Sequence, residues 1–338
     1  SIRRCWGSGS WDMLEGFWTD RRVRHLMEMA GTSGKSAGEP LIVSMGSTGP
    51  PNVEEPIFIR DHLVCDGAQV TRPSIDPYRE PVDTQVYLPG LGIRLSQPLI
   101  FTVHQTYPPE FRRAAVRAAY NLGLLAYIYG EAVLEPDLHG YSERVLLDYM
   151  HGEMGEYLVL VGSGQNIGEL AKILKITSST DPRLLESLGW GDIAGVLVDE
   201  DHETPIEVAT SLVDKELRKL RYDGKPLRDR ATLLSSSRRV RGADDIFKLL
   251  ALGADAVAIS DAALIASGCV DDAIPENVIY ERLENLALAL QKEVKLLAGA
   301  AGVSRLFTSL VGNRELLRAI GLSADVRYKL GVRQAGVG

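Results

Sequence analysis

The stretch that most constrains the fold of this chain spans residues 232–268. The sequence predicts, in order, a strand at 231–234, a polar turn at 235–241, an amphipathic helix at 243–252 and a strand at 256–259. Strand, helix and strand within about thirty residues make a parallel βαβ crossover. Towards the end of a long chain, this unit is typical of the last strands of a (β/α)8 barrel, whose strand ends often bind a phosphate.

Length and charge limit the class of protein further. The 338 residues suffice for one α/β barrel of the TIM type, which needs about 250 residues. A net charge of −8 argues against a nucleic-acid partner, because phosphate backbones require a basic face. No apolar run has the length of a membrane span, and the first residues lack the apolar core of a signal peptide. Three scattered cysteines predict no disulfide framework, so we expect a cytoplasmic protein with reduced thiols.

Composition and periodicity suggest three regions. Residues 1–55 are rich in Gly, Ser and Pro and read as an irregular N-terminal extension with one amphipathic helix at 18–30. Residues 56–275 read as the barrel with lead-in strands, and residues 276–338 as C-terminal helices packed on it.

Within these regions the apolar pattern predicts individual elements. Strands are expected at 98–103, 124–129, 157–161 and 195–198, and helices at 109–122, 142–150, 182–188, 205–220, 277–297 and 305–320. Residues 167–178 read either as one helix or as a short helix leading into a strand at 173–177. The crossover between the third and fourth strands is too short for a full βαβ unit.

Three segments carry a family likeness: RPSIDPYREPVDTQVYLPG at 72–90, RGADDIFKLLALGADAVAISDAALIASGC at 241–269 and KEVKLLAGAAGVSRLFTSLVGNRELLRAI at 292–320. Together they resemble the FMN-binding domain of the glutamate synthase large subunit in its compact archaeal form, over roughly residues 55–320. The resemblance implies a (β/α)8 barrel, bound FMN and a flavin oxidoreductase that forms glutamate from 2-oxoglutarate and ammonia.

The same resemblance places candidate residues near the flavin ring. Thr102 and His104 stand where the first strand of the family approaches the flavin, and Gly130 and Glu131 keep the first half of a Gly-Glu-Gly-Gly turn. Lys175 matches a strand lysine and would stabilise negative charge on a reduced flavin, while Glu131 would orient an amine or accept a proton. Three of these residues also have a purely structural interpretation. His104 also reads as a loop histidine, Glu131 as a surface turn residue and Lys175 as a solvated lysine on a helix.

The turns expected at the flavin phosphate differ from the family pattern. Bare peptide N–H groups of glycine turns usually hold such a phosphate. Here the turn at 200–204 is acidic and has no glycine, and Asp261 would set a negative charge beside a dianion. Like charges about 4 Å apart repel by about 4 kcal/mol at an effective dielectric near 20. A rebuilt anion site would use the hydroxyls of Ser235, Ser236, Ser237 and Ser260 and the charges of Arg238, Arg239 and Arg241. The alternative is a polar turn with surface arginines.

Other family features are missing. Val159 stands where the family has a second strand lysine, and Cys269 alone remains where the family often has several cluster cysteines. Asp201, His202 and Glu203 are metal-ligand residue types, but adjacent residues rarely bind one ion together, so no metal is expected.

Two functions therefore stay open. One is a glutamate-synthase-like flavin oxidoreductase with a degraded cofactor site, supplied with electrons and ammonia by other proteins. The other is a non-catalytic barrel that acts as a scaffold or regulatory subunit, for which the apolar stripe of the helix at 277–297 offers a seat. The lost glycines predict little or no FMN in the purified protein, and a partner subunit or a homo-oligomer remains open.

Overall fold

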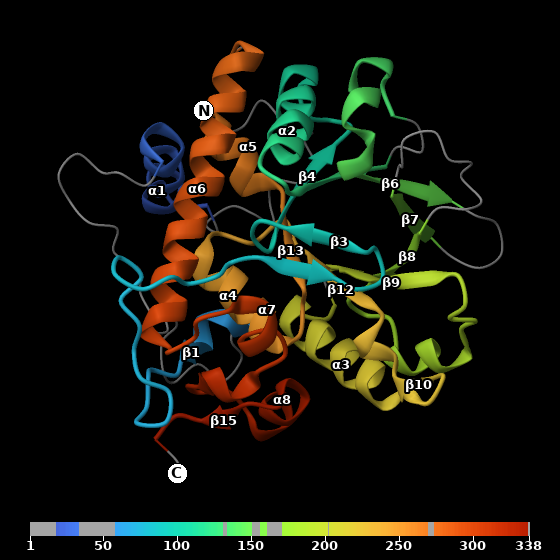
Figure 1. Ribbon diagram of the computed structural model, residues 1–338, viewed down its shortest axis with the longest axis vertical. Coiled ribbons are helices and arrows are strands. Elements are labelled where there is room, and N and C mark those ends of the chain that lie inside the picture. Colours follow the sequence, from blue (N-terminus) through green and yellow to red (C-terminus); the bar gives the residue numbers. More distant parts are fainter. Residues whose placement is uncertain are drawn as a thin grey trace.

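The computed structural model describes residues 18–33, 58–130, 134–150, 156–160, 171–201, 203–269 and 274–336. Its centre is a closed barrel of strands in the order β12-β13-β4-β5-β6-β7-β8-β9 (Figure 1). The strands are β4 (Leu99–His104), β5 (Leu125–Tyr129), β6 (Val145–Met150), β7 (Glu156–Leu160), β8 (Lys172–Thr177), β9 (Ile193–Asp199), β12 (Thr232–Ser236) and β13 (Ala256–Ile259). The predicted α/β barrel of the TIM type is confirmed.

One barrel strand runs against the others. Strand β7 pairs antiparallel with both β6 and β8, whereas the remaining neighbours are parallel. An antiparallel neighbour needs only a turn, while a parallel one needs a crossover of a dozen or more residues. The reversed strand therefore explains why the third crossover is so short in the sequence.

Two expectations in this region are corrected. The predicted helix at 142–150 is wrong, because 3-10 helix η3 (Pro136–Arg144) ends there and β6 begins at Val145. The error has a physical cause: a short apolar run fits a buried helix or a buried strand equally well. The strand alternative at 173–177 is confirmed as β8, and residues 167–170 lie outside the described part.

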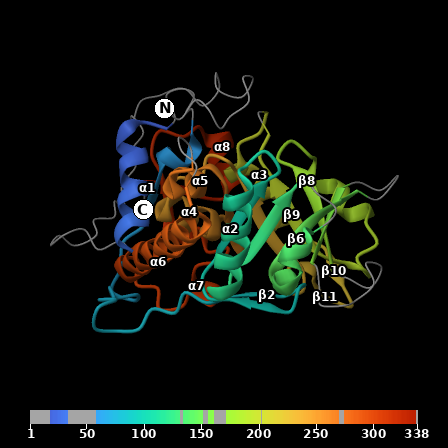
Figure 2. The same ribbon diagram turned by 90° about the horizontal axis from the view of Figure 1, so that it is seen from above.

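Helices surround the barrel (Figure 2). They are α2 (Pro109–Asn121), α3 (Ile206–Lys219), α4 (Ala243–Leu252), α5 (Asp261–Ser267) and α6 (Glu276–Ala300), with 3-10 helices η6 (Pro182–Ser187) and η7 (Leu227–Asp229) and a small hairpin of β10 (Arg221–Tyr222) and β11 (Lys225–Pro226). The apolar stripe of α6, which the sequence offered as a seat for a partner, is buried: Ile279, Leu283, Leu286, Leu290, Val294 and Leu297. No helix in the described ranges is both long enough and apolar enough to cross a bilayer.

The lead-in segment closes the N-terminal end of the barrel. It contains η2 (Ile59–His62), β1 (Leu63–Cys65) and a hairpin of β2 (Val86–Leu88) and β3 (Ile93–Leu95). At the tip of the hairpin, the N–H of Gly90 donates to Thr232 Oγ1 over 3.1 Å. A Cβ at this position would lie 1.6 Å from the carbonyl oxygen of Ala194, so the approach requires glycine.

Both ends of the described chain pack on the barrel. The predicted N-terminal helix is confirmed as α1 (Asp20–Thr32), which lies beside α6 in Figures 1 and 2. The predicted helix at 305–320 is wrong: the segment divides into α7 (Leu306–Ser309), η8 (Arg314–Leu316) and β14 (Leu317–Ala319). Gly312 has a φ of 71°, a left-handed conformation in the turn between α7 and η8.

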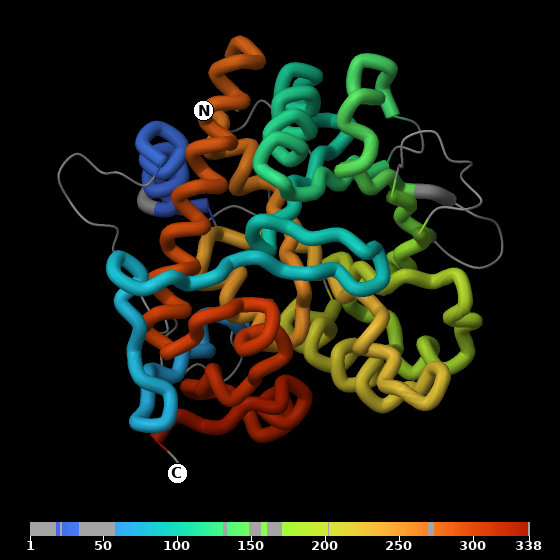
Figure 3. Tube along the Cα trace, viewed as in Figure 1, coloured from blue at the N-terminus to red at the C-terminus, as the bar shows by residue number. Residues whose placement is uncertain are grey.

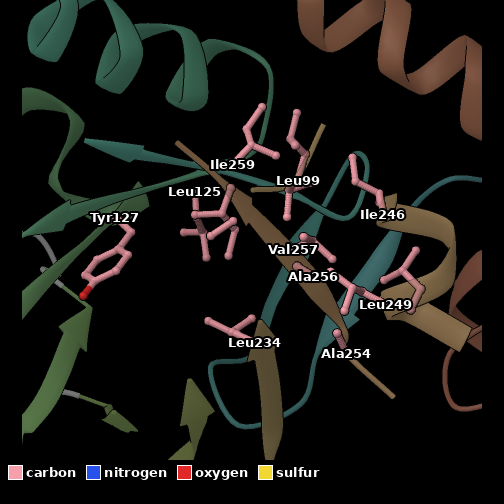
Figure 4. Close-up of a cluster of buried hydrophobic side chains, with 14 of the residues drawn as sticks. Leu99, Leu125, Tyr127, Leu234, Ile246, Leu249, Ala254, Ala256, Val257 and Ile259 are labelled. Carbon is pink, nitrogen blue, oxygen red and sulfur yellow. The ribbon is translucent and has the colours of Figure 1, made fainter. Parts of the chain in front are cut away.

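The C-terminal segment joins the lead-in segment in a small sheet. After α8 (Ala324–Leu330) comes β15 (Arg333–Gln334), and the small sheet has the order β1-β14-β15. Figure 3 shows the lead-in and C-terminal segments side by side at the same end of the molecule. In the barrel wall, Leu125, Leu234 and Ala256 lie in one buried cluster with Ile246 and Leu249 of α4 (Figure 4). The core thus fixes the strand ends that carry the candidate site.

Candidate functional site

Polar side chains converge inside the C-terminal mouth of the barrel. Lys175 on β8 contacts Asp148 on β6 and the ring of Tyr129 on β5, although β7 and β6 separate these strands. Contacts across intervening strands require side chains that point into the barrel. Parallel neighbours in register share a face, which adds His104 beside Tyr129. We call His104, Tyr129, Asp148, Lys175 and Asp199 the mouth cluster.

Lys175 lies on a strand, with its side chain mostly enclosed, rather than on a solvated helix. Its side chain is 8% exposed, its Nζ lies 3.3 Å from Asp148 Oδ2, and it sits 4.1 Å from the centre of the Tyr129 ring. Asp148 also accepts hydrogen bonds of 2.7 Å from Tyr127 Oη and from the N–H of Gly130. Lys175 and Asp148 therefore neutralise each other within a fixed network.

His104 is held uncharged. Its ring packs 4.6 Å from that of Tyr129 and 5.0 Å from that of Tyr107, measured between ring centres. Burial, together with the nearby positive charges of Arg238 and Lys175, lowers the pKa of His104 to about 3. Thr102 lies one step deeper on the same face of β4. It is 2% exposed, and its Oγ1 has no hydrogen-bond partner among the described residues.

Asp199 adds a second carboxylate to the mouth cluster. It lies in register with Ser236 of β12 and Thr177 of β8, which places it at the strand ends. Burial raises the pKa of Asp199 to about 6, and a hydrogen bond from Ser236 and the charge of Lys175 only partly offset that effect. At neutral pH the mouth cluster thus holds one lysine against two carboxylates.

The turn after β13 is filled by Asp261, which is fully buried at the start of α5. Its Oδ1 accepts a 2.8 Å hydrogen bond from Tyr107 Oη, and Arg238 Nε lies 3.2 Å from its Oδ2. Ser260 Oγ lies 2.7 Å from Tyr107 Oη. Burial raises the pKa of Asp261 to about 6, although Arg238 and Tyr107 oppose the shift. The hydroxyl of Tyr107 and the guanidinium of Arg238 thus already donate to this carboxylate.

The turn after β12 is filled in the same way. Glu200 accepts a hydrogen bond from Ser237 Oγ, and its Oε1 lies 2.6 Å from Arg239 Nη2. Ser236 faces Asp199, whereas the Oγ of Ser235 pairs with Thr210 Oγ1 of α3 at 2.7 Å. Only part of the triple-serine turn therefore faces the mouth.

The acidic turn after β9 folds around its own carboxylate. Asp201 accepts hydrogen bonds from Ser178 Oγ at 2.8 Å, from the N–H of Ser179 at 2.9 Å and from the N–H groups of Glu203 and Thr204 at 3.0 and 3.2 Å. Although partial burial opposes it, the hydrogen bonds from Ser179 and Ser178 lower the pKa of Asp201. In each of the three turns, a side-chain carboxylate of the chain itself thus accepts hydrogen bonds from donors at that strand end.

Several predicted residues do come together, and others do not. Thr102, His104, Lys175 and Ser236 face the mouth, Gly130 supports Asp148, and Ser260 and Arg238 meet at Asp261. Glu131 and His202 lie outside the described residues. Within the described ranges, no group of three or more His, Cys, Asp or Glu is placed to hold a metal ion. Val159 and Cys269 are buried.

Sequence reasoning missed the aromatic wall of the mouth. Tyr127 and Tyr129 occur two residues apart on β5, so they share a face, and Tyr107 follows β4 by three residues. The spacing of Leu125, Tyr127 and Tyr129, two residues apart along one strand, was the sequence signal that could have predicted this aromatic wall. Burial and the adjacent Asp148 raise the pKa of Tyr127, which keeps its hydroxyl protonated as a donor.

Comparisons with known proteins agree with this architecture. Residues 166–274 match the model of the conserved region in glutamate synthase. The archaeal-type glutamate synthase [NADPH] of Dehalococcoides mccartyi is 25% identical over 439 aligned positions, covering 94% of this chain and 84% of that protein. The archaeal glutamate synthase [NADPH] of Methanocaldococcus jannaschii is 25% identical, covering 84% of this chain and 79% of that protein. The first alignment is longer than the 338-residue chain, so that relative has internal segments with no counterpart here.

Solved structures show the same fold at low identity. A mandelate oxidase with bound 2-hydroxy-phenylacetamide superposes with a TM-score of 0.55 at 15% identity, over 92% of this chain and 99% of that one. The flavin-binding domain of baker's yeast flavocytochrome b2 gives a TM-score of 0.53 at 13% identity, over 83% of this chain and 84% of that one. The resemblance noted in the sequence is confirmed: the chain is similar to the archaeal-type glutamate synthases over most of its length.

Proposed function

We propose that this protein is a glutamate-synthase-like barrel that does not hold FMN and serves as a non-catalytic scaffold or regulatory subunit. The observation that carries the proposal is Asp261. Its buried carboxylate accepts from Tyr107 Oη and pairs with Arg238 at the strand end where flavin barrels of this kind would place a phosphate.

The residues at the phosphate end do not fit a dianion. A bound phosphate needs N–H groups, hydroxyls or cations that are still able to donate to it. Here Asp261 pairs with Arg238 and accepts a hydrogen bond from Tyr107. Glu200 pairs with Arg239 and accepts from Ser237, and Asp201 accepts from backbone N–H groups of its own turn. A phosphate at about 4 Å from the Asp261 carboxylate would also meet repulsion of about 4 kcal/mol at an effective dielectric near 20.

The ring end supports the same proposal. An anionic reduced flavin is stabilised by a net positive charge beside the ring. Lys175 is the one cation in the mouth cluster as described, and it is paired with Asp148 at 3.3 Å, while Asp199 adds a further carboxylate. His104 contributes no charge, because its pKa is lowered to about 3. The mouth therefore lacks a free positive charge for that role.

A second candidate is a flavin oxidoreductase of the glutamate-forming class. It is favoured by the names of the relatives and by neighbours whose structures hold FMN, such as a mandelate oxidase with an FMN adduct. In that case Lys175 would face the ring, and a partner protein would supply electrons and ammonia.

Absorption spectra of the purified protein separate the two candidates. We expect no flavin band near 450 nm, either in the protein as purified or after incubation with FMN and gel filtration. The flavin-binding domain of baker's yeast flavocytochrome b2 is the positive control, carried through the same steps. A yellow preparation with about one FMN per chain would overturn the non-catalytic proposal and support the enzyme.

A further inference from the structure

A cavity of about 240 Å³ opens beside the β2–β3 hairpin, at the opposite end of the barrel from the mouth cluster. Its lining residues are Asp83, Gln85, Val86, Tyr87, Arg94, Arg305, Phe307 and Thr308. They come from two distant parts of the sequence, the lead-in hairpin and α7, which lie next to each other in Figure 1. The cavity is smaller than the roughly 300–1,000 Å³ typical of drug-sized ligands, so it suits a small molecule.

The walls of this cavity are fixed by the backbone. The N–H of Asp83 donates to the carbonyl of Ser304 over 2.8 Å, and the N–H of Leu306 donates back to the carbonyl of Asp83 over 3.0 Å. The rings of Tyr87 and Phe307 meet edge to face, with centres 6.2 Å apart. These backbone hydrogen bonds hold the two segments together, so the cavity forms without a ligand.

Two cations in the lining have no assigned partner. Arg94 and Arg305 are both exposed, and among the described residues neither side chain makes an ion pair or a hydrogen bond. Arg144 lies close by and donates to the carbonyl of Arg94 over 3.1 Å. The one acid in the lining, Asp83, has its Oδ1 engaged by the N–H of Gln85 at 2.9 Å. The cavity is thus locally positive on a chain with a net charge of −8.

Arginines in the interior of the described part of the protein, unlike Arg94 and Arg305, form ion pairs. Arg60, Arg228 and Arg241 each contact at least two carboxylates of the chain itself. A guanidinium has a planar set of donors that matches a carboxylate or a phosphate. Two such groups left unneutralised around one cavity, next to two aromatic rings, match an anion with a small apolar body.

We propose that the cavity between the β2–β3 hairpin and α7 binds a small dianion, a phosphate monoester or a dicarboxylate. Arg94 and Arg305 would bind the anionic groups, and Tyr87 and Phe307 would pack against the apolar part. The proposal uses no residue of the mouth cluster, so it is independent of whether the barrel holds FMN.

Isothermal titration calorimetry with inorganic phosphate, phenyl phosphate and succinate tests the site. We expect the wild-type protein to bind at least one of the two organic probes. Arg94→Gln and Arg305→Gln should each weaken that binding by about tenfold or more, because each removes a charge-assisted contact. Phe307→Leu should weaken phenyl phosphate more than inorganic phosphate. Which organic probe binds more tightly tells a phosphate monoester from a dicarboxylate.

Arg24→Gln on α1 is the matched control, since Arg24 is also exposed and lines no part of this cavity. It should leave binding unchanged, and all variants should unfold at the wild-type temperature. The proposal fails if the wild-type protein binds neither phenyl phosphate nor succinate at about 10 mM, an affinity weaker than about −3 kcal/mol. It also fails if Arg24→Gln weakens binding as much as the cavity variants do.

Discussion

At the scale of single residues, Asp261 shows how one side chain can decide the chemistry of a strand end. The carboxylate is fully buried, yet it is held in place by Tyr107 and Arg238. Its pKa is raised to about 6 from an ordinary value of 3.8, so the folded protein binds this proton more tightly than the unfolded chain does. The unfolding free energy therefore falls as the pH rises from about 4 to above 6.

Asp261→Asn removes this dependence, because asparagine has the shape of the protonated acid and does not titrate. The unfolding free energy of the variant relative to wild type should be higher at pH 8 than at pH 4, by roughly 3 kcal/mol. Urea unfolding at both pH values measures this difference. An offset between the two proteins that does not change with pH would show that Asp261 is not a strained buried acid.

At the scale of elements, the chain follows its local pattern wherever the pattern is long. Helices α2, α3, α4 and α6 lie close to their predicted positions because each carries an apolar face over several turns. The pattern failed at 142–150 and 305–320, where short apolar runs fit more than one element and tertiary pairing decides. Strand β7 runs antiparallel to β6 and β8, which lie on either side of it in the barrel.

The β2–β3 hairpin offers a test of how the barrel is closed. Gly90→Ala should lower the unfolding free energy by about 2 kcal/mol or more, because its Cβ would lie 1.6 Å from the backbone oxygen of Ala194. Gly67→Ala, which meets nothing within 4 Å, is the control and should stay within about 0.5 kcal/mol of wild type. Equal stability of the two variants would mean that the hairpin tip does not seal the barrel.

Helix α1 is attached through a titratable contact. His25 Nε2 lies 3.2 Å from Glu293 Oε1 of α6, and this hydrogen bond raises the pKa of His25, with further contributions from Glu28 of α1 and Asp244 of α4. A raised histidine pKa stabilises the docked state fully below about pH 6.5 and is lost as the pH rises through the folded value. The side chain is 48% exposed, so the effect should be only about 0.5 kcal/mol.

Hydrogen exchange of α1 amides, corrected for intrinsic rates, measures this contact. Protection in the wild-type protein should be greater at pH 6 than at pH 9. His25→Gln should show no such change, since glutamine does not titrate. Protection that rises with pH would contradict the assigned sign.

At the scale of the whole molecule, a buried ionic network at the N-terminal end of the barrel joins the C-terminal segment to the helices. Asp214 of α3 is fully buried and accepts hydrogen bonds of 2.9 Å from Arg228 Nε, 2.9 Å from Arg314 Nη2 and 2.8 Å from Arg218 Nε. Arg228 also binds Asp255 at 2.8 Å. Removing one member of such a network leaves buried charges without compensation.

Asp214→Ala should therefore lower the unfolding free energy by about 3–5 kcal/mol, as measured by urea unfolding. Asp325→Ala, which removes an exposed partner of Lys329, should cost less than about 1 kcal/mol. If both variants cost the same, the network does not contribute more than a surface ion pair.

The sequence predicts the barrel and some of the residues at its mouth, but it does not predict the ion pairs and pKa shifts of those residues. Lys175 and His104 could be placed by resemblance and by strand ends. The ion pair of Lys175 with Asp148 and the uncharged state of His104 depend on burial and on residues of other strands. Likewise Asp261 was recognised as acidic in the sequence, while its partners Tyr107 and Arg238 follow other strands, after β4 and β12. Long-range partners of this kind have no signature in one sequence.

The most direct test of the account is a fluorescence titration of FMN with the wild-type protein beside Asp261→Ser. The central claim is that the carboxylates of the chain itself already occupy the groups a flavin phosphate would need. It predicts no saturable binding by the wild-type protein at about 100 µM, and binding at least about tenfold tighter after Asp261→Ser. Micromolar binding of FMN by the wild-type protein, unchanged in the variant, would contradict the claim.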